Sequence, residues 1–392
     1  INGNPDLTNI HILNNVFEMP DTDPDFAFGE YVFRTGGQND CSGLQINNNT
    51  FNANGTNGGI AIYLNPASSI TNVQVNGNTF SGKVLQGVTV DGMNNVTVDG
   101  NTLNTSSLTG TGDNPQLIRI TNWSSNAMTG ISVTNNLLGT GGANQGGKYS
   151  IVLRKPGAGS VNGVTVDGNT VKNTTIAGIR QLENVMGVAY SGNTIESNPI
   201  GIKVDSGTVT SITDNSFGNT NFNLVNSTVA TLDASPNWWG SDDPATISPT
   251  ISGDVDWAPF WTDAGMTTLS TLTTVYVDAA YTSESAGGHV FGYDAFTTIQ
   301  EGVDAVDEGG TVNVNSGTYN EEVHVNKNNV TLQGLGSGET RPLVNNTGEY
   351  VGSGNGIVID FDYTDVTVDN FRITAVNTTV LGVGNNHNCK LS

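Results

Sequence analysis

The stretch VTVDGN decides the fold, and it occurs at residues 96–101 and again at 164–169. In both copies apolar residues alternate with polar ones, and the stretch ends on an asparagine. Related stretches end on asparagines throughout the first 217 residues, and the full set is Asn15, Asn49, Asn78, Asn101, Asn136, Asn169, Asn193 and Asn215. Their separations are 34, 29, 23, 35, 33, 24 and 22 residues. The spacing indicates a repeat of about 22–24 residues with insertions.

Alternation of period two, in segments rich in Val, Ile and Thr, predicts half-buried strands rather than helices. A unit of this length holds two or three short strands and cannot bury its apolar face alone, so successive units must stack. Stacked strands lie about 4.8 Å apart. We therefore expect the asparagines to form a ladder, with side-chain amides bonded along the axis. An asparagine at a turn also tolerates the left-handed backbone conformation, and we expect these asparagines to adopt it.

The repeat resembles the right-handed parallel β-helices of the pectate lyase type and of many microbial surface proteins. The resemblance implies an all-β fold, a right-handed parallel β-helix or solenoid, for nearly the whole chain. It also implies an extracellular or cell-surface location. It says little about activity, because this fold hosts lyases, hydrolases, epimerases, adhesins and purely structural walls.

The composition describes an acidic chain of 392 residues with a formal net charge of −23. This charge argues against nucleic acid or an anionic membrane as a general partner. No stretch reaches the roughly 18 apolar residues of a membrane span. Cys41 and Cys389 lie in different repeats and form no disulfide framework.

Changes of pattern predict three regions: a parallel β-helix over 1–232, a Trp-rich cap and linker over 233–275, and the start of a second parallel β-helix over 276–392. The sequence SPNWWG at 235–240 resembles the NWWG segment that closes many surface-protein β-helices. We expect a lid over the last coil, and an aromatic sugar platform is the alternative, from Trp238, Trp239, Trp257 and Trp261.

The second region opens with apolar residues at helical spacing, namely Phe296, Ile299, Val303 and Val306. The spacing predicts a short helix, capped by Asp294, that covers the first coil of the second β-helix. About three coils follow. Both ends of the chain read as the middle of a coil, so we expect a fragment of a longer extracellular protein whose copies could stack end to end.

Basic residues are scarce, at 13, and four of them share one strand position when the coils are aligned. The expected outward column contains Arg119, Arg154, Arg180 and Lys203, with Tyr63 preceding them on an earlier coil. Like charges stacked this closely repel, so something must compensate them.

Two kinds of compensation remain open. Neighbouring acids, Asp91, Glu183 and Asp205, could pair with the cations, or an extended acidic polysaccharide could bind along the column. The second hypothesis has a catalytic form, because Arg180 and Lys203 resemble in kind the base and neutralising cation of polysaccharide lyases.

Calcium is a further possibility, since DTDPD at 21–25 places three carboxylates in one loop, on Asp21, Asp23 and Asp25. No other cofactor is indicated. The sequence therefore predicts an extracellular structural or adhesive β-helix of a cell-surface layer, adhesin or filament, with acidic glycans or other copies of itself as partners. The alternative is a carbohydrate-active enzyme, a lyase or an epimerase-like protein, that acts on an acidic polysaccharide.

Overall fold

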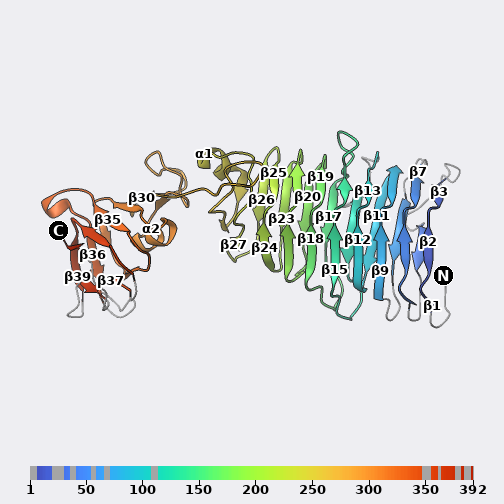
Figure 1. Ribbon diagram of the computed structural model, residues 1–392, viewed down its shortest axis with the longest axis horizontal. Coiled ribbons are helices and arrows are strands. Elements are labelled where there is room, and N and C mark those ends of the chain that lie inside the picture. Colours follow the sequence, from blue (N-terminus) through green and yellow to red (C-terminus); the bar gives the residue numbers. More distant parts are fainter. Residues whose placement is uncertain are drawn as a thin grey trace. The chain divides into compact units, whose positions relative to one another are not determined.

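The computed structural model describes residues 7–19, 31–35, 41–53, 59–65, 71–106, 114–346, 355–360, 363–375, 381–383 and 390–391. The chain forms two compact units, one of residues 1–242 with 249–269 and one of residues 243–248 with 270–392. Each unit is an all-β parallel β-helix, drawn from blue to yellow and from orange to red respectively (Figure 1). No helix in the described part is long and apolar enough to cross a membrane.

Each full coil of the first unit contributes one strand to each of three parallel sheets. The first sheet contains β1 (Leu7–Thr8), β2 (His11–Leu13), β5 (Cys41–Ser42), β6 (Gln45–Asn47), β9 (Thr71–Asn76), β12 (Asn94–Asp99), β15 (Ile131–Thr134), β18 (Val164–Asp167), β21 (Val188–Ser191) and β24 (Val209–Thr213). The second contains β3 (Val16–Met19), β7 (Thr50–Ala53), β10 (Thr79–Gly82), β13 (Thr102–Leu103), β16 (Leu137–Leu138), β19 (Thr170–Lys172), β22 (Thr194–Glu196) and β25 (Ser216–Gly218). The third contains β4 (Tyr31–Thr35), β8 (Gly59–Leu64), β11 (Val84–Asp91), β14 (Gln116–Thr121), β17 (Tyr149–Leu153), β20 (Ala177–Gln181), β23 (Ile200–Val204), β26 (Phe222–Asn226) and β28 (Ile251–Ser252).

The inward residues of these strands form the core of the first unit. Inward residues at equivalent positions of successive coils stack on one another. Phe17, Phe51 and Phe80 of the second sheet stack in sequence, with ring centroids 4.8 Å apart at each step. This spacing is the distance between neighbouring strands, so each ring packs on the ring of the next coil. The inward face of each strand thus specifies both its pairing register with the next coil and its contribution to the core.

The predicted asparagine ladder is present at the corner between the first and second sheets. It lies inside the helix from Asn49 onward, whereas Asn15 is exposed. The backbone N–H and the side-chain amide of each asparagine both donate to Oδ1 of the asparagine one coil further on, at 2.8–3.0 Å. Asn136 and Asn215, for example, are completely buried. The ladder continues into the cap through Asn237, which belongs to the NWWG segment.

One expectation about the ladder is wrong. The left-handed backbone conformation belongs to the residue before each ladder asparagine, such as Asn135 with φ 54° and Asp214 with φ 57°. The reason is that the ladder residue must turn its amide into the interior, whereas the tight turn that precedes it needs a positive φ. Glycine at that place, as at Gly100 and Gly168, meets the same need without steric cost.

The segment that closes the first unit includes β27 (Leu232–Asp233) and β29 (Val255–Asp256), and the four predicted lid tryptophans make different contacts there. Trp238 is partly buried, and its backbone N–H donates to the carbonyl of Asn215. Trp239 stacks on Phe217 at 4.8 Å and is 2% exposed, which extends the second sheet's aromatic and aliphatic stack by one more layer. Trp257 packs on Phe260 at 5.6 Å. Trp261 is partly exposed, and its Nε1 donates to Asp214 Oδ1 at 3.0 Å.

The second unit has α1 (Pro244–Ile247), α2 (Ile299–Ala305) and the 3-10 helix η2 (Gly338–Thr340), whereas the 3-10 helix η1 (Ser248–Thr250) leads into β28. Its largest sheet contains β30 (Thr274–Val277), β31 (Ala295–Phe296), β32 (Thr311–Val314), β35 (Thr331–Gly334), β38 (Thr367–Asp369) and β41 (Lys390–Leu391). The two smaller sheets contain β33 (Thr318–Tyr319), β36 (Leu343–Asn346) and β39 (Arg372–Ala375), and β34 (Val323–Val325), β37 (Ile357–Ile359) and β40 (Leu381–Val383).

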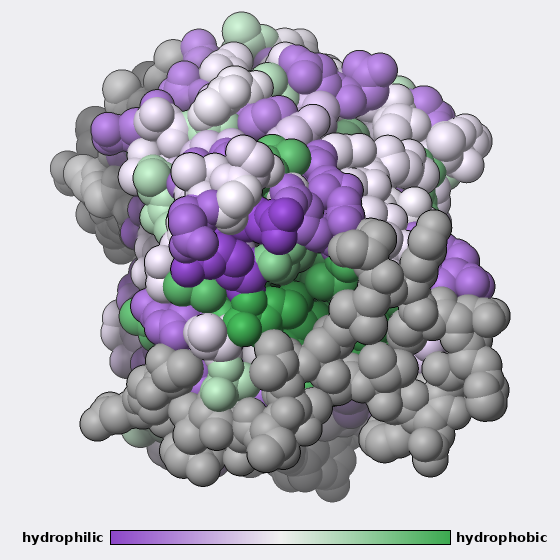
Figure 2. All heavy atoms as spheres, turned by 90° about the vertical axis from the view of Figure 1, so that its left-hand side faces the viewer, coloured by the Kyte–Doolittle hydropathy of each residue, from purple (hydrophilic) through white to green (hydrophobic). Residues whose placement is uncertain are grey.

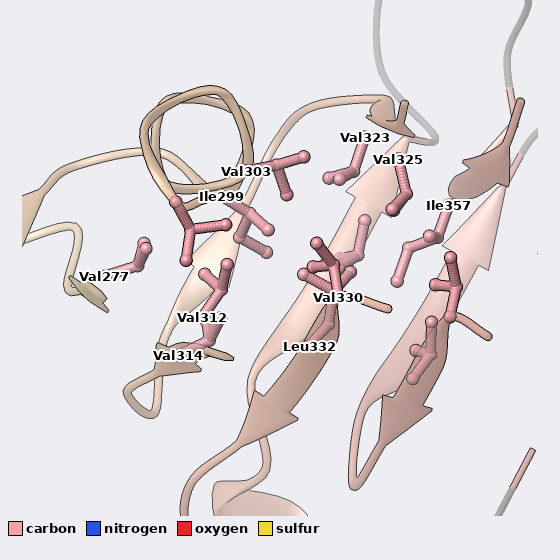
Figure 3. Close-up of a cluster of buried hydrophobic side chains, with 14 of the residues drawn as sticks. Val277, Ile299, Val303, Val312, Val314, Val323, Val325, Val330, Leu332 and Ile357 are labelled. Carbon is pink, nitrogen blue, oxygen red and sulfur yellow. The ribbon is translucent and has the colours of Figure 1, made fainter. Parts of the chain in front are cut away.

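The predicted helix α2 packs on the core of the second unit, where Ile299 and Val303 lie against the buried valines of the first coil (Figure 3). Its cap differs from the prediction. Thr298 caps the helix in a capping box with Glu301, whereas Asp294 accepts from the backbone N–H of Val290. The threonine stands directly before the first helical residue, which is where a cap must lie.

At the other end of the second unit, Phe371 and Ile373 pack against the same core but stay partly exposed. Figure 2 looks at this end and shows apolar residues gathered beside hydrophilic ones.

Candidate functional site

The outer face of the third sheet holds most of the predicted site residues of the first unit. On β14, Ile118 and Ile120 point inward and are completely buried, so Arg119 between them points outward. Strand pairing aligns one outward column across the coils, and its members are Arg34, Tyr63, Thr89, Arg119, Val152, Arg180, Lys203 and Val225. We call this set the outer column.

The structure changes the predicted column at one coil. Val152, not Arg154, pairs with both Arg119 and Arg180, and Arg154 lies two residues further along the chain. The register follows the inward residues, because Ile118 pairs with Ile151. Val152 is itself only 2% exposed, packed on the outer face with Tyr149 and Ala177. Charge alone was therefore a misleading guide to register.

Arg34 extends the outer column toward the N-terminus, and the sequence analysis missed it. Its guanidinium carbon lies 5.8 Å from the centroid of the Tyr63 ring on the next coil. The alternating stretch YVFRT at 31–35 carries the signal that could have revealed it.

Two cations of the outer column share one carboxylate. Arg180 Nε lies 2.7 Å from Asp205 Oδ2, and Lys203 Nζ lies 2.8 Å from Asp205 Oδ1. Burial acts to raise the pKa of Asp205, but the hydrogen bonds and charges of Lys203 and Arg180 outweigh burial and lower that pKa below its usual value. Arg180 also donates to the Tyr149 hydroxyl at 3.0 Å and lies over its ring.

Arg154, outside the outer column, is neutralised by a bidentate pair. Its Nε and Nη2 donate to the two carboxylate oxygens of Glu183 at 3.1 and 2.7 Å. Its guanidinium carbon lies 5.7 Å from the centroid of the Trp123 ring, and Trp123 is 58% exposed. The predicted pairing of Glu183 and Asp205 with cations is thus observed.

Asp91 serves a different purpose from the predicted one. It is 4% exposed, and it accepts from the Tyr63 hydroxyl at 3.0 Å and from the backbone N–H of Trp123 at 3.0 Å. The carboxylate therefore fixes Tyr63 and the start of the Trp123 loop, and among the described residues it forms no ion pair with the arginines.

Arg119 is the exception among the cations of this face. It forms no ion pair or hydrogen bond with any described residue, and its Nε is buried without a partner. Burial, followed by the neighbouring charge of Arg154, lowers its pKa from the usual value. The outward side chains of Gln116 and Thr121 on the same strand also hold a buried oxygen without a partner. A buried polar group without a partner costs roughly 1–3 kcal/mol.

The arrangement argues against base catalysis by Arg180 or Lys203. A catalytic base must be free to take a proton from the substrate, whereas each of these side chains is held by a carboxylate at hydrogen-bond distance. Within the described ranges no three His, Cys, Asp or Glu side chains are placed to hold a metal ion. The predicted calcium ligands Asp21, Asp23 and Asp25 lie outside the described residues.

Comparison with known proteins adds no family: no protein-family model, no curated protein and no solved structure matches this chain.

Replacing Asp205 by asparagine leaves Arg180 and Lys203 adjacent and without their shared carboxylate. Because the pKa of Asp205 is lowered by folding, its contribution to stability exists above the unfolded-state pKa of about 3.9 and is lost as the pH falls through the lower folded value. We expect Asp205→Asn to cost about 1 kcal/mol at neutral pH, the upper end for a solvent-accessible pair. Urea unfolding measures this loss. An equal loss of stability well below the folded-state pKa of Asp205 would contradict the ion pairs that we assign to its carboxylate.

Proposed function

We propose that this chain is an extracellular or cell-surface β-helix with a structural or adhesive role, and that it binds acidic glycans through Arg119 on the third sheet. The observation that carries the proposal is the unpaired, half-buried guanidinium of Arg119, on a face where Arg154, Arg180 and Lys203 all have carboxylate partners. A carboxylate or sulfate would supply the missing partner.

The surroundings of Arg119 support a sugar as the carrier of that anion. The exposed indole of Trp123 offers an apolar surface, and its loop is anchored by the bond from its backbone N–H to Asp91. Aromatic residues that are held rigidly and remain exposed are typical of binding surfaces.

The same geometry favours binding over cleavage. A lyase on this face would need one free base and one free neutralising cation, yet Arg180 and Lys203 are tied to a single carboxylate. The long stack of identical coils instead suits a rigid wall or spacer, since each coil adds strands in register without a separate core.

The binding test uses alginate, polygalacturonate and chondroitin sulfate as probes, with dextran as the neutral control. We expect Arg119→Ala to weaken binding of the preferred acidic glycan by roughly 10- to 100-fold, the value of a hydrogen bond to a charged group. Isothermal titration calorimetry measures the affinity, and ultraviolet absorbance of the same mixtures detects any unsaturated product of a lyase.

The matched control is Arg372→Ala in the second unit, which removes an arginine paired to Glu339 and should leave binding unchanged. Equal binding by the wild type and Arg119→Ala would refute the role of Arg119. Accumulation of unsaturated products, abolished in Lys203→Ala, would establish the lyase instead.

A further inference from the structure

A histidine on the second unit bridges two carboxylates from successive coils. His324 Nε2 lies 2.9 Å from Glu322 Oε1, and His324 Nδ1 lies 2.9 Å from Asp360 Oδ1. Glu322 and His324 belong to the coil of β34, whereas Asp360 follows β37 on the next coil. The imidazole therefore connects two coils through side chains, in addition to the backbone hydrogen bonds between their strands.

With both carboxylates ionised, these contacts require a protonated ring. A neutral imidazole has one N–H and one lone pair, so it can donate to only one of two ionised carboxylates. With both partners at 2.9 Å, only the imidazolium satisfies both. Consistent with this, the hydrogen bond from His324 to Asp360 raises the pKa of His324, burial opposes the rise, and the bond to Glu322 adds to it.

The bridge matters for stability because Glu322 is a buried carboxylate. Its side chain is only 3% exposed, and its other oxygen accepts from the backbone N–H of Asn355 at 3.0 Å and from the Asn346 side chain at 3.5 Å. A buried carboxylate is stable only when it is paired and hydrogen-bonded. Loss of the charge on His324 would remove a charged partner from this buried carboxylate.

The neighbouring elements supply no competing cation to His324 among the described residues. On α2, Gln300 clamps the histidine backbone by accepting from its N–H and donating to its carbonyl, and it also donates to Asp304. Glu321 accepts from the first backbone N–H groups of α2, and Lys327 donates to carbonyls at the end of α2. On β37 the residue paired with His324 is the uncharged Val358.

We propose that Glu322, His324 and Asp360 form a proton-dependent lock between two coils of the second unit, closed while the imidazole is charged and open when it is neutral. The direction of the pH dependence follows from the linkage between protonation and folding. A group whose pKa is raised by folding stabilises the fold fully below its unfolded-state value, about 6.5, and that stability is lost as the pH rises through the folded value. The lock therefore holds in mildly acidic surroundings and opens in alkaline ones.

Two measurements on the full chain test the lock. Nitrogen-15 shifts of the histidine rings follow protonation, with His324→Gln identifying the signal, and we expect His324 to titrate above the ordinary value of about 6.5. Asp360→Asn should lower that midpoint. Hydrogen exchange of residues 355–360, corrected for intrinsic rates, should then increase roughly two- to fivefold across the transition, as expected for the loss of a partly exposed ion pair.

The matched control is His289→Gln, which removes a histidine bonded to the single carboxylate Asp294 at 3.2 Å and should leave the exchange of 355–360 unchanged. His324→Gln should abolish the pH response of this segment. A midpoint at or below the ordinary value, a midpoint unaffected by Asp360→Asn, or the same corrected response in the wild type and His324→Gln would each overturn the proposal.

Discussion

Replacing Asn136 by alanine is expected to destabilise the first unit by about 3–5 kcal/mol. The change removes the Oδ1 that accepts from the backbone and side chain of Asn101, and the amide that donates to Asn169 Oδ1 and to the carbonyl of Val98. Four buried hydrogen bonds are lost, each with a net value of about 0.5–1.5 kcal/mol, and the backbone N–H of Asn101 is left without an acceptor. The total places this variant in the upper tail of single substitutions. Urea denaturation followed by circular dichroism measures the loss.

The control for this prediction is Asn126→Ala, which truncates an exposed asparagine in the turn after β14. It should change the free energy of unfolding by no more than about 0.5 kcal/mol. A loss of less than about 1 kcal/mol for Asn136→Ala would mean that water replaces the missing amide. The ladder would then specify the register of the coils without contributing much to their stability.

Truncating Trp239 to alanine is the second large expected effect, about 3–5 kcal/mol. Trp239 is 2% exposed and covers Phe217, the last inward residue of the second sheet. Without the indole, the Phe217 ring and the stack beneath it face either a cavity or water. Differential scanning calorimetry of the full chain should show the loss as a lower melting temperature.

Two further tryptophan variants separate stacking from other roles of Trp239. Trp239→Phe keeps a ring on Phe217, and because Trp239 Nε1 has no hydrogen-bond partner within the described structure, it should cost far less than alanine. Trp123→Ala removes an exposed tryptophan and should cost at most about 1 kcal/mol, the value of its contact with Arg154. Equal losses for Trp239→Ala and Trp123→Ala would rule out a closing role for Trp239.

The architecture was predictable because the ladder recurs in the sequence. Each VTVDGN-like stretch specifies inward apolar residues, a turn and a buried amide within six residues, so the period alone predicted the stacked parallel strands. The last ladder residue, Asn237, was missed because SPNWWG was interpreted only as a closing segment, although Leu232 and Ala234 precede Asn237 at the spacing of the other repeats. The bond between Asn215 and Asn237 shows that the ladder continues into this segment.

The candidate site was predictable only in part. Arg119, Arg180, Lys203 and Tyr63 fall in the outer column as expected, since their strands share the inward pattern. Arg154 does not, because loops of different length precede each third-sheet strand and only the pairing of Ile118 with Ile151 fixes the register. The lack of a partner for Arg119 depends on where distant loops place their carboxylates, which no local pattern encodes.

The ladder also shows which parts of this protein can vary in length and which cannot. Neighbouring ladder asparagines are 22 to 35 residues apart, yet every link has the same donors, acceptor and nearly the same length. A loop can therefore grow or shrink between two links without disturbing either, and a whole coil can be gained or lost provided that one asparagine goes with it. The frame therefore tolerates changes in its loops, including those around Arg119, while the links between the coils stay the same.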